Sequence, residues 1–461
     1  MANFSQSQVP RFSVDVYQNE FLPEDGREVS AIVTVTSTGG GAGGGAPLAG
    51  ASASPTGIPA PAPGAAVVVM VDCSGSMDYP PTKMRNAREA TAAAIDTLPD
   101  GVEFAVVAGT HEAKEVYPAD GGLAVADART RAAAVRSLRR LAAGGGTAIG
   151  TWLRLADYLF ADAASPIRHG ILLTDGRNEH ESPEDLRAAL EAVAGQFTCD
   201  ARGVGTDWEV QEVTAIASAL LGTADIVADP AQLTADFTAM MTDALGKEVA
   251  DVALRLWTPV GAEVVFVKQV APAVEDLTDR RTEAGPRAGD YPTGSWGDES
   301  RDYHVCVRVP DAGIGHEMLA ARASLIVPAA DGGPPRVLSQ GLVRAVWTDD
   351  LAASTAINAQ VAHYTGQAEL AAAIRSGLDA RKSGDFDGAT AKLGRAVQLA
   401  AASGNADTAK LLSKVVDVVD AATGTVRLKA KVADADEMTL ETRSTKTVRV
   451  KNQGRSSTTA G

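Results

Sequence analysis

Cysteine is scarce in this sequence. The chain of 461 residues has three cysteines, Cys73, Cys199 and Cys306, which are far apart and odd in number. A disulfide framework needs an even set at regular spacing, so the sequence excludes a small fold held together by disulfides. Scattered thiols are typical of a reducing compartment, and we therefore expect a cytoplasmic protein.

Long hydrophobic runs are missing as well. The longest run, residues 65–71, has the length of a strand, whereas a helix that spans a bilayer needs about 18 or more apolar residues. The first 20 residues do not have a positively charged start followed by an apolar segment, so we expect no signal peptide. The sequence therefore predicts no association with a membrane.

Basic residues are the minority among the charged ones. Lys and Arg number 42 against 58 Asp and Glu, which gives a net charge of -16. Such an acidic chain is a poor partner for nucleic acid or for anionic lipid surfaces. It suits a basic partner, or an acidic partner that is bridged by a metal. Hydrophobic residues make up 45%, so most of the chain should fold, into about two to four domains.

The first half of the chain divides into three segments. Residues 1–38 contain two alternating apolar patterns around a turn, which predicts a β-hairpin. Residues 39–63 are almost entirely Gly, Ala, Pro and Ser, and predict a flexible linker. From 64 to 246, apolar strand patterns alternate with helical ones. This order predicts a mostly parallel sheet with helices on both faces.

The second half divides into three further segments. Residues 247–350 alternate with period two and predict a β-sandwich, which the N-terminal hairpin would complete. Residues 351–423 are Ala-rich, with apolar residues at helical spacing. They resemble a helical hairpin of the tetratricopeptide type, which needs another surface to pack against. Residues 424–461 are polar, and we expect an extended tail. The fold class is therefore α/β plus all-β plus α.

The predicted tail is basic on an acidic body. Residues 424–461 have eight Lys or Arg and four Asp or Glu, a net charge of +4. One interpretation is a solvated tail. The other is a docking segment controlled by phosphorylation at Thr442 or Thr445, because this threonine-rich string is similar to the bacterial kinase substrates that forkhead-associated domains bind.

Oxygen-bearing side chains follow two of the predicted parallel strands and a glycine-rich loop. The carboxyl ends of parallel strands meet at one edge of a sheet, so we expect these side chains to converge. Hard oxygen ligands fit Mg²⁺, or Mn²⁺ as a close substitute. Five side chains leave room for a sixth ligand, which a partner's carboxylate could supply. The residues are Asp72, Ser74, Ser76, Thr147 and Asp175.

This set resembles the metal-ion-dependent adhesion site of von Willebrand factor A domains and integrin I domains. The motif elements are Asp72-Cys73-Ser74-Gly75-Ser76, the distal Thr147, and Thr174-Asp175-Gly176. The resemblance implies a Rossmann-like domain over residues 64–246, with the two serines as direct ligands and Thr147 joining in the ligand-bound state. It also implies that the two aspartates act directly or through water. The implied function is metal-dependent binding of a protein that offers an Asp or Glu, as an intracellular scaffold.

Two alternatives stand beside the metal-dependent scaffold. Asp72 and the serines could simply cap a helix that begins at Lys83, although this leaves Thr147 and Asp175 unexplained. The metal could instead serve a Mg²⁺-dependent phosphoester hydrolase, by polarising a phosphoryl oxygen. The sequence shows no His or Lys near the site as a general base, so we predict no catalytic residue and no enzyme.

Overall fold

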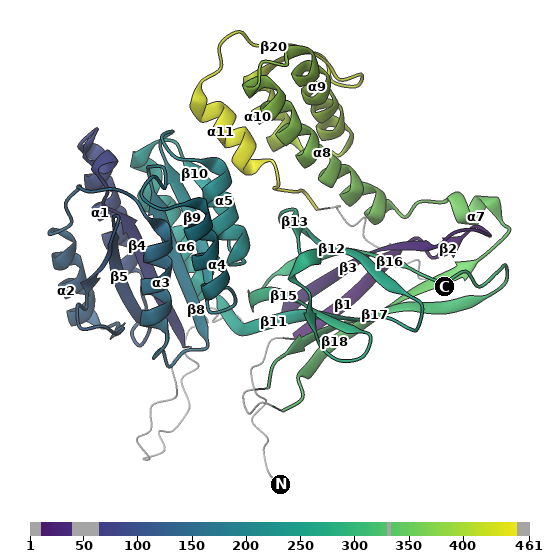
Figure 1. Cartoon of the computed structure of the whole chain (residues 1–461), viewed down its shortest axis with the longest axis horizontal. Coiled ribbons are helices and arrows are strands. Elements are labelled where there is room, and N and C mark those ends of the chain that lie inside the picture. Colours follow the sequence, from purple (N-terminus) through teal and green to yellow (C-terminus); the bar gives the residue numbers. More distant parts are fainter. Residues whose placement is uncertain (1–10, 39–63, 330–332, 450–461) are drawn as a thin grey trace, which may run out of the picture.

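A computed structural model describes residues 11–38, 64–329 and 333–449 of the chain. These residues form an α/β domain, a β-sandwich and a mainly helical region, which Figure 1 shows on the left, at the lower right and at the top. The predicted linker at 39–63 lies outside the described residues. No helix within the described ranges combines the length and the apolar character needed to cross a membrane.

The α/β domain is built on a mixed sheet of seven strands. Five strands are parallel, in the order β10-β9-β8-β4-β5, and β6 and β7 run antiparallel to β5. Every residue of the central strand β4 is buried, because helices cover both faces of the sheet. The strands are β4 (Ala65–Asp72), β5 (Glu103–Gly109), β6 (Ala113–Tyr117), β7 (Ala124–Val125), β8 (Ile167–Thr174), β9 (Thr198–Val204) and β10 (Ala224–Val227).

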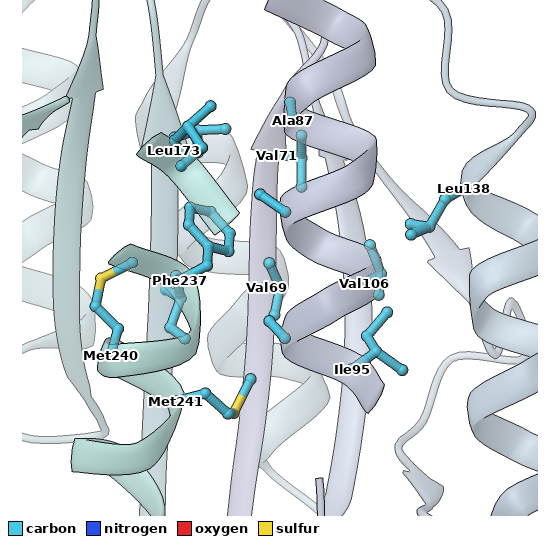
Figure 2. Close-up of a cluster of buried hydrophobic side chains, with 14 of the residues drawn as sticks. Val69, Val71, Ala87, Ile95, Val106, Leu138, Leu173, Phe237, Met240 and Met241 are labelled. Carbon is cyan, nitrogen blue, oxygen red and sulfur yellow. The ribbon is translucent and has the colours of Figure 1, made fainter. Parts of the chain in front are cut away.

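Three helices cover each face of this sheet. On one face, Val69 and Val71 of β4 pack with Ala87 of α1, Leu138 of α2 and Phe237 of α6 (Figure 2). The opposite face of the sheet packs against α3, α4 and α5. The helices are α1 (Thr82–Asp96), α2 (Ala128–Leu138), α3 (Ile149–Phe160), α4 (Pro183–Val193), α5 (Val210–Ala219) and α6 (Leu233–Leu245), with short 3-10 turns at Gly75–Asp78 and Pro230–Gln232.

The β-sandwich consists of a sheet of five strands and a sheet of six. Their apolar sides form one core, which includes Val33, Leu254 and Trp347. The first sheet contains β1 (Arg11–Gln18), β3 (Glu28–Thr38), β16 (Ser300–Arg308), β12 (Glu263–Ala271) and β13 (Glu275–Asp276). The second contains β14 (Thr282–Glu283), β15 (Ala288–Gly297), β11 (Lys247–Trp257), β17 (Glu317–Val327), β18 (Arg336–Trp347) and β2 (Phe21–Leu22).

The N-terminal strands lie in both sheets of this sandwich. Strand β3 pairs antiparallel with β16, from Glu28 opposite Arg308 to Thr36 opposite Ser300. The two residues of β2 pair in parallel with Val346 and Trp347 of β18. Strand β3 therefore has a partner on each side, β1 and β16, and it is an interior strand of its sheet.

The helical region consists of α7 (Leu351–Thr355), α8 (Ala359–Lys382), α9 (Phe386–Ala402) and α10 (Ala406–Val415), followed by a hairpin of β19 (Val416–Asp420) and β20 (Thr425–Leu428). Gly384 and Gly404 have positive φ angles and end α8 and α9. Asp385 and Asn405 then cap the next helices, by accepting hydrogen bonds from backbone N–H groups of Gly388 and Thr408.

The C-terminal segment corrects the prediction of an extended polar tail. Its residues 434–443 form helix α11 (Asp434–Arg443), in which Leu440 is fully buried in the core of the helical region. Ion pairs with α8 and α10 hold the rest of this helix, at 2.7 Å for Arg381–Glu437, 2.8 Å for Lys382–Glu441 and 2.7 Å for Lys414–Asp436. The helix has few apolar residues, and for this reason the sequence pattern did not reveal it.

The two threonines proposed as phosphorylation sites lie in or next to this helix. Thr442 is buried, and its hydroxyl donates to the carbonyl of Met438 at 2.7 Å. The carbonyl of Thr445 accepts a hydrogen bond from the N–H of Val274, in the sandwich, at 2.8 Å. Recognition of a phosphothreonine needs an accessible, extended segment. The structure therefore does not support docking of a forkhead-associated domain at these threonines.

Glu299 forms ion pairs within the sandwich, next to the point where the chain leaves the α/β domain. Its carboxylate accepts hydrogen bonds from Lys247 at 2.8 Å and from Arg301 at 2.9 Å. Lys247 begins β11 two residues after α6 ends. Burial would raise the pKa of Glu299, but the charges of Arg301 and Lys247 lower it to about 2. The folded protein therefore gains stability from an ionised Glu299.

We predict that Glu299→Gln destabilises the fold by about 2–3 kcal/mol at pH 7, since it leaves two cations without their partner. The folded pKa lies below the ordinary value of 4.5. The difference in the free energy of unfolding between wild type and variant should therefore be complete above pH 4.5 and shrink as the pH falls toward 2. Thermal unfolding between pH 3 and pH 7 measures this difference.

The control for this experiment is Glu263→Gln. Glu263 pairs with Arg308 on the surface, and its side chain is 63% exposed, so we expect a change below about 1 kcal/mol. A Glu299→Gln effect that stays constant across the pH range would contradict the assignment.

Candidate metal centre

The candidate centre lies where strands β4 and β8 end. Asp72 is the last residue of β4, and Asp175 directly follows Thr174, the last residue of β8. The two strands pair in parallel, so their carboxyl ends meet at one edge of the sheet. Both carboxylates are fully buried, and Ser74 and Thr147 are buried beside them. The sheet topology alone thus brings distant residues together.

Asp72 organises the two loops. One oxygen of its carboxylate accepts the N–H of Ser74 at 2.8 Å, and the other accepts the hydroxyl of Thr174 at 2.7 Å and the N–H of Asp175 at 3.4 Å. Burial raises the pKa of Asp72 to about 6, although the hydrogen bonds from Ser74 and Thr174 oppose this change. The negative charge of Asp175 raises it further.

The hydroxyl groups surround one point above the loops. Ser74 Oγ lies 2.9 Å from Ser76 Oγ, which in turn donates to Asp175 Oδ1 at 2.6 Å. A β-carbon placed on Gly176 would lie 3.0 Å from Ser76 Oγ, 3.8 Å from Thr147 Oγ1 and 3.9 Å from Ser74 Oγ. Because residue 176 is glycine, this space among three hydroxyl oxygens is not filled by a side chain.

These donors fit a hard divalent cation. In the part of the chain that the structure describes, no group of three or more His, Cys, Asp or Glu is placed to hold a metal ion. A metal at this edge would therefore take hydroxyl as well as carboxylate oxygens. That donor set suits Mg²⁺ or Mn²⁺ better than a thiolate-preferring or imidazole-preferring metal.

The loop that presents Thr147 is tied to the Asp-x-Ser-x-Ser loop by its backbone. Gly75 donates its N–H to the carbonyl of Gly145 at 3.0 Å, and Gly144 donates to that of Cys73 at 2.8 Å. Gly145 has a φ of +82°, a conformation that suits glycine. The loop can thus approach closely enough to place a threonine hydroxyl beside the two serines.

The interpretation of Asp72 and the serines as helix caps is wrong. Helix α1 begins after Pro81, and no side chain caps its first turn. Ser74 precedes only the short 3-10 turn Gly75–Asp78, where its side chain makes no capping bond either. The polar groups of this loop are turned toward β8 instead.

Lys83 is a member of the site that the sequence interpretation missed. Its ammonium donates to Asp175 Oδ2 at 2.7 Å and to Asp207 Oδ2 at 3.3 Å. Burial would lower the pKa of Lys83, but its hydrogen bonds and the charges of both aspartates raise it above its usual value. A signal was present, because Lys83 stands at helical spacing from Ala87 and Ala90 on the buried stripe of α1.

Two histidines also lie nearer than expected. His180 Nδ1 accepts the N–H of Thr147 at 3.3 Å, and His111 Nδ1 accepts that of Gly146 at 3.4 Å. Their ring centroids are 6.4 Å apart, and both side chains are exposed. The expectation of no His or Lys near the site was therefore wrong.

A hollow of about 410 Å³ opens above the hydroxyl groups. It contains the two serines and Thr147 at its base, and exposed side chains from the loops after β8 and β9 at its rim. Its lining residues are Ser74, Gly75, Ser76, Gly145, Gly146, Thr147, Gly176, Arg177, Glu179, His180, Thr206 and Asp207. The hydroxyl oxygens can thus be reached from outside, as a site for a ligand on another molecule requires.

Two family models match parts of the chain. The family model of the von Willebrand factor type A domain matches residues 65–226, and that of the von Willebrand factor type A C-terminal domain matches residues 398–444. The second match includes helix α11, so the supposed tail is part of a recognised domain.

Known structures agree with this assignment. A von Willebrand factor type A protein from Catenulispora acidiphila is 52% identical, with a TM-score of 0.88 over 97% of this chain and 99% of that chain. The chain therefore belongs to the von Willebrand factor type A family. The ArnB paralog VWA2 from Sulfolobus acidocaldarius is 15% identical, with a TM-score of 0.54 over 94% of this chain and 98% of its own, and it shows the fold alone.

One curated relative matches part of the chain. An uncharacterized protein of Synechocystis sp. is 29% identical over 215 residues, which are 46% of this chain. The match spans about half, 49%, of that relative's length.

The packing behind the site gives a prediction about stability. Gly109 ends β5 beside Asp72, and a β-carbon there would lie 2.3 Å from the ring of Trp152. Trp152 is fully buried in α3 and donates to the carbonyl of Thr110 at 2.7 Å, so its ring has no room to move. We predict that Gly109→Ala destabilises the α/β domain by about 1–3 kcal/mol.

The matched control is Gly144→Ala in the same region. A β-carbon on Gly144 would meet no atom within 4 Å, so we expect a change below about 0.5 kcal/mol. Urea unfolding, followed by tryptophan fluorescence, compares the two variants with the wild type. Equal stability of both would contradict the close packing of Trp152 on Gly109.

Proposed function

We propose that this protein binds a partner protein through a divalent metal ion, Mg²⁺ or Mn²⁺. The observation that supports this most strongly is the convergence of three hydroxyls and two carboxylates beside the space above Gly176. The five residues predicted from the sequence are the ones that would hold the ion: Asp72, Ser74, Ser76, Thr147 and Asp175.

The types of donor explain why such an ion would seek a further ligand. When bound, the ion supplies a concentrated positive charge that attracts a carboxylate. Ser74, Ser76 and Thr147 offer neutral oxygens, which leave most of that charge uncompensated. Asp72 is already engaged by Ser74 and Thr174, and it mainly holds the loops in place. A partner's Asp or Glu side chain is the ligand that this donor set favours.

The family and the shape of the site agree with protein binding. Von Willebrand factor type A domains typically mediate protein–protein interactions, and the hollow has exposed polar residues at its rim, including Arg177 and His180. We also propose a cytoplasmic scaffold, since all three cysteines are free and buried.

The Mg²⁺-dependent phosphoester hydrolase remains the second candidate. His180 lines the hollow and is the one observation in its favour, because an imidazole there could act as a base. Lys83 does not serve as a base, because its contacts with Asp175 and Asp207 favour the protonated form. An assay on a generic phosphate ester with Mg²⁺ distinguishes hydrolysis from binding.

We predict that Mg²⁺ or Mn²⁺ raises the thermal unfolding temperature of the wild type by ligand linkage. The triple variant Ser74→Ala, Ser76→Ala, Asp175→Ala removes three of the five donors and should show no such shift. An equal shift in both proteins would exclude this site as the place of binding.

A second experiment tests partner binding under the same metal conditions. Immobilised wild-type protein should retain a native partner from lysate in Mg²⁺ and release it in chelator, whereas Asp72→Ala should retain none. Retention that is independent of the metal and of Asp72 would contradict the proposal.

A further inference from the structure

Lys83 pairs with Asp175, so the lysine and a metal ion at the candidate centre would compete for the same carboxylate. Both oxygens of Asp175 are engaged in the described structure, Oδ1 by Ser76 at 2.6 Å and Oδ2 by Lys83 at 2.7 Å. The side chain of Asp175 is fully buried, and that of Lys83 is 7% exposed. The ammonium therefore neutralises this carboxylate from inside the protein, where solvent screens little.

The lysine also changes the charge that an incoming cation meets. Asp72 and Asp175 together have a charge of -2 when ionised, and Lys83 reduces the sum at the base of the hollow to -1. A divalent ion next to Asp175 would in addition be repelled by the ammonium at short range. Ala87 and Ala90 on the same buried stripe are apolar, so the packing of the helix does not require a charged residue at position 83.

A second carboxylate lies within reach of the same ammonium. Asp207, in the loop after β9, is 3.3 Å from Lys83 Nζ, and its side chain is 70% exposed. Asp207 lines the hollow, whereas Asp175 is fully buried. Lys83 thus contacts two carboxylates. Asp175 is buried and is the one that a metal would use. Asp207 lies further out and can hold the ammonium when a metal occupies Asp175.

We propose that Lys83 is a built-in competitor of the metal: it neutralises Asp175 in the metal-free protein, and it shifts to Asp207 when a divalent ion binds. This inference rests on the proposed function of the same site. It implies that the bare site holds its metal weakly. A partner's carboxylate adds the negative charge that Lys83 cancels, so partner and metal should bind cooperatively.

The test is a calorimetric titration of the full chain with Mn²⁺. We expect Lys83→Met to bind Mn²⁺ about tenfold more tightly than the wild type, since both the competitor and the repulsion are removed. Lys83→Gln, which keeps an N–H donor for Asp175, should also bind more tightly. If the methionine variant does not fold, the glutamine variant decides.

The matched control is Arg85→Met. Arg85 is a cation on the first turns of the same helix, but its side chain is exposed. It controls for the loss of one positive charge in this region, and we expect its affinity to change by less than about threefold.

Asp207→Asn tests the second half of the proposal. Without the negative charge of the outer carboxylate, residue 207 attracts the ammonium less and Lys83 stays on Asp175, so Mn²⁺ affinity should fall by about threefold in the wild-type background. In the Lys83→Met background the same substitution should have a smaller effect. Equal effects in both backgrounds would show that Asp207 does not act through Lys83, and would overturn the shift.

The remaining outcomes separate this inference from the proposed function. If the wild type binds Mn²⁺ and both Lys83 variants bind it equally well, the competitor role is wrong and the metal site stands. If neither the wild type nor the Lys83 variants bind Mn²⁺, both proposals fail. Binding that is measurable only in the Lys83 variants supports the competitor role in its strongest form.

Discussion

The buried carboxylate of Asp72 is the constraint on which the site depends. A fully buried aspartate is costly unless hydrogen bonds compensate it, and the donors here are the N–H groups of Ser74 and Asp175 and the hydroxyl of Thr174. Because these donors come from the end of one strand and from the loops after two neighbouring strands, satisfying one carboxylate fixes both loops. The same arrangement turns the serine hydroxyls and Asp175 toward one another. The positions of the proposed metal ligands therefore follow from the hydrogen bonds that compensate the buried carboxylate of Asp72.

Polar contacts join the other two parts of the protein to the α/β domain. Arg280 of the sandwich donates to the hydroxyl of Ser218 in α5 at 2.8 Å. From the C-terminal segment, Arg443 and Lys446 reach Asp225 in β10 at 2.8 and 2.6 Å. These contacts involve β10 and α5 of the domain, and helix α11 lies next to β10 (Figure 1). They leave the loops after β4 and β8 free to present the hollow.

The sequence was informative where local pattern determines structure. Strand β4 is an unbroken apolar run, and the oxygen-bearing residues at alternate positions after it indicated the edge at which they meet. It was uninformative where a contact joins distant residues. Lys83 and Asp175 are 92 positions apart, and only the topology shows that they touch. Helix α11 was missed because it has too few apolar residues to form a periodic stripe, and β2 because two residues give no periodic signal. Its pairing with β18 depends on the tertiary structure alone.

A divalent metal is proposed to bind among the hydroxyls and carboxylates at the ends of β4 and β8. The most direct measurement is anomalous X-ray diffraction from crystals of the full chain grown with Mn²⁺. We expect one strong anomalous peak within bonding distance, about 2.0–2.3 Å, of the hydroxyl oxygens of Ser74 and Ser76. Well-ordered density for these side chains without such a peak, or with the peak at another place in the chain, would contradict it.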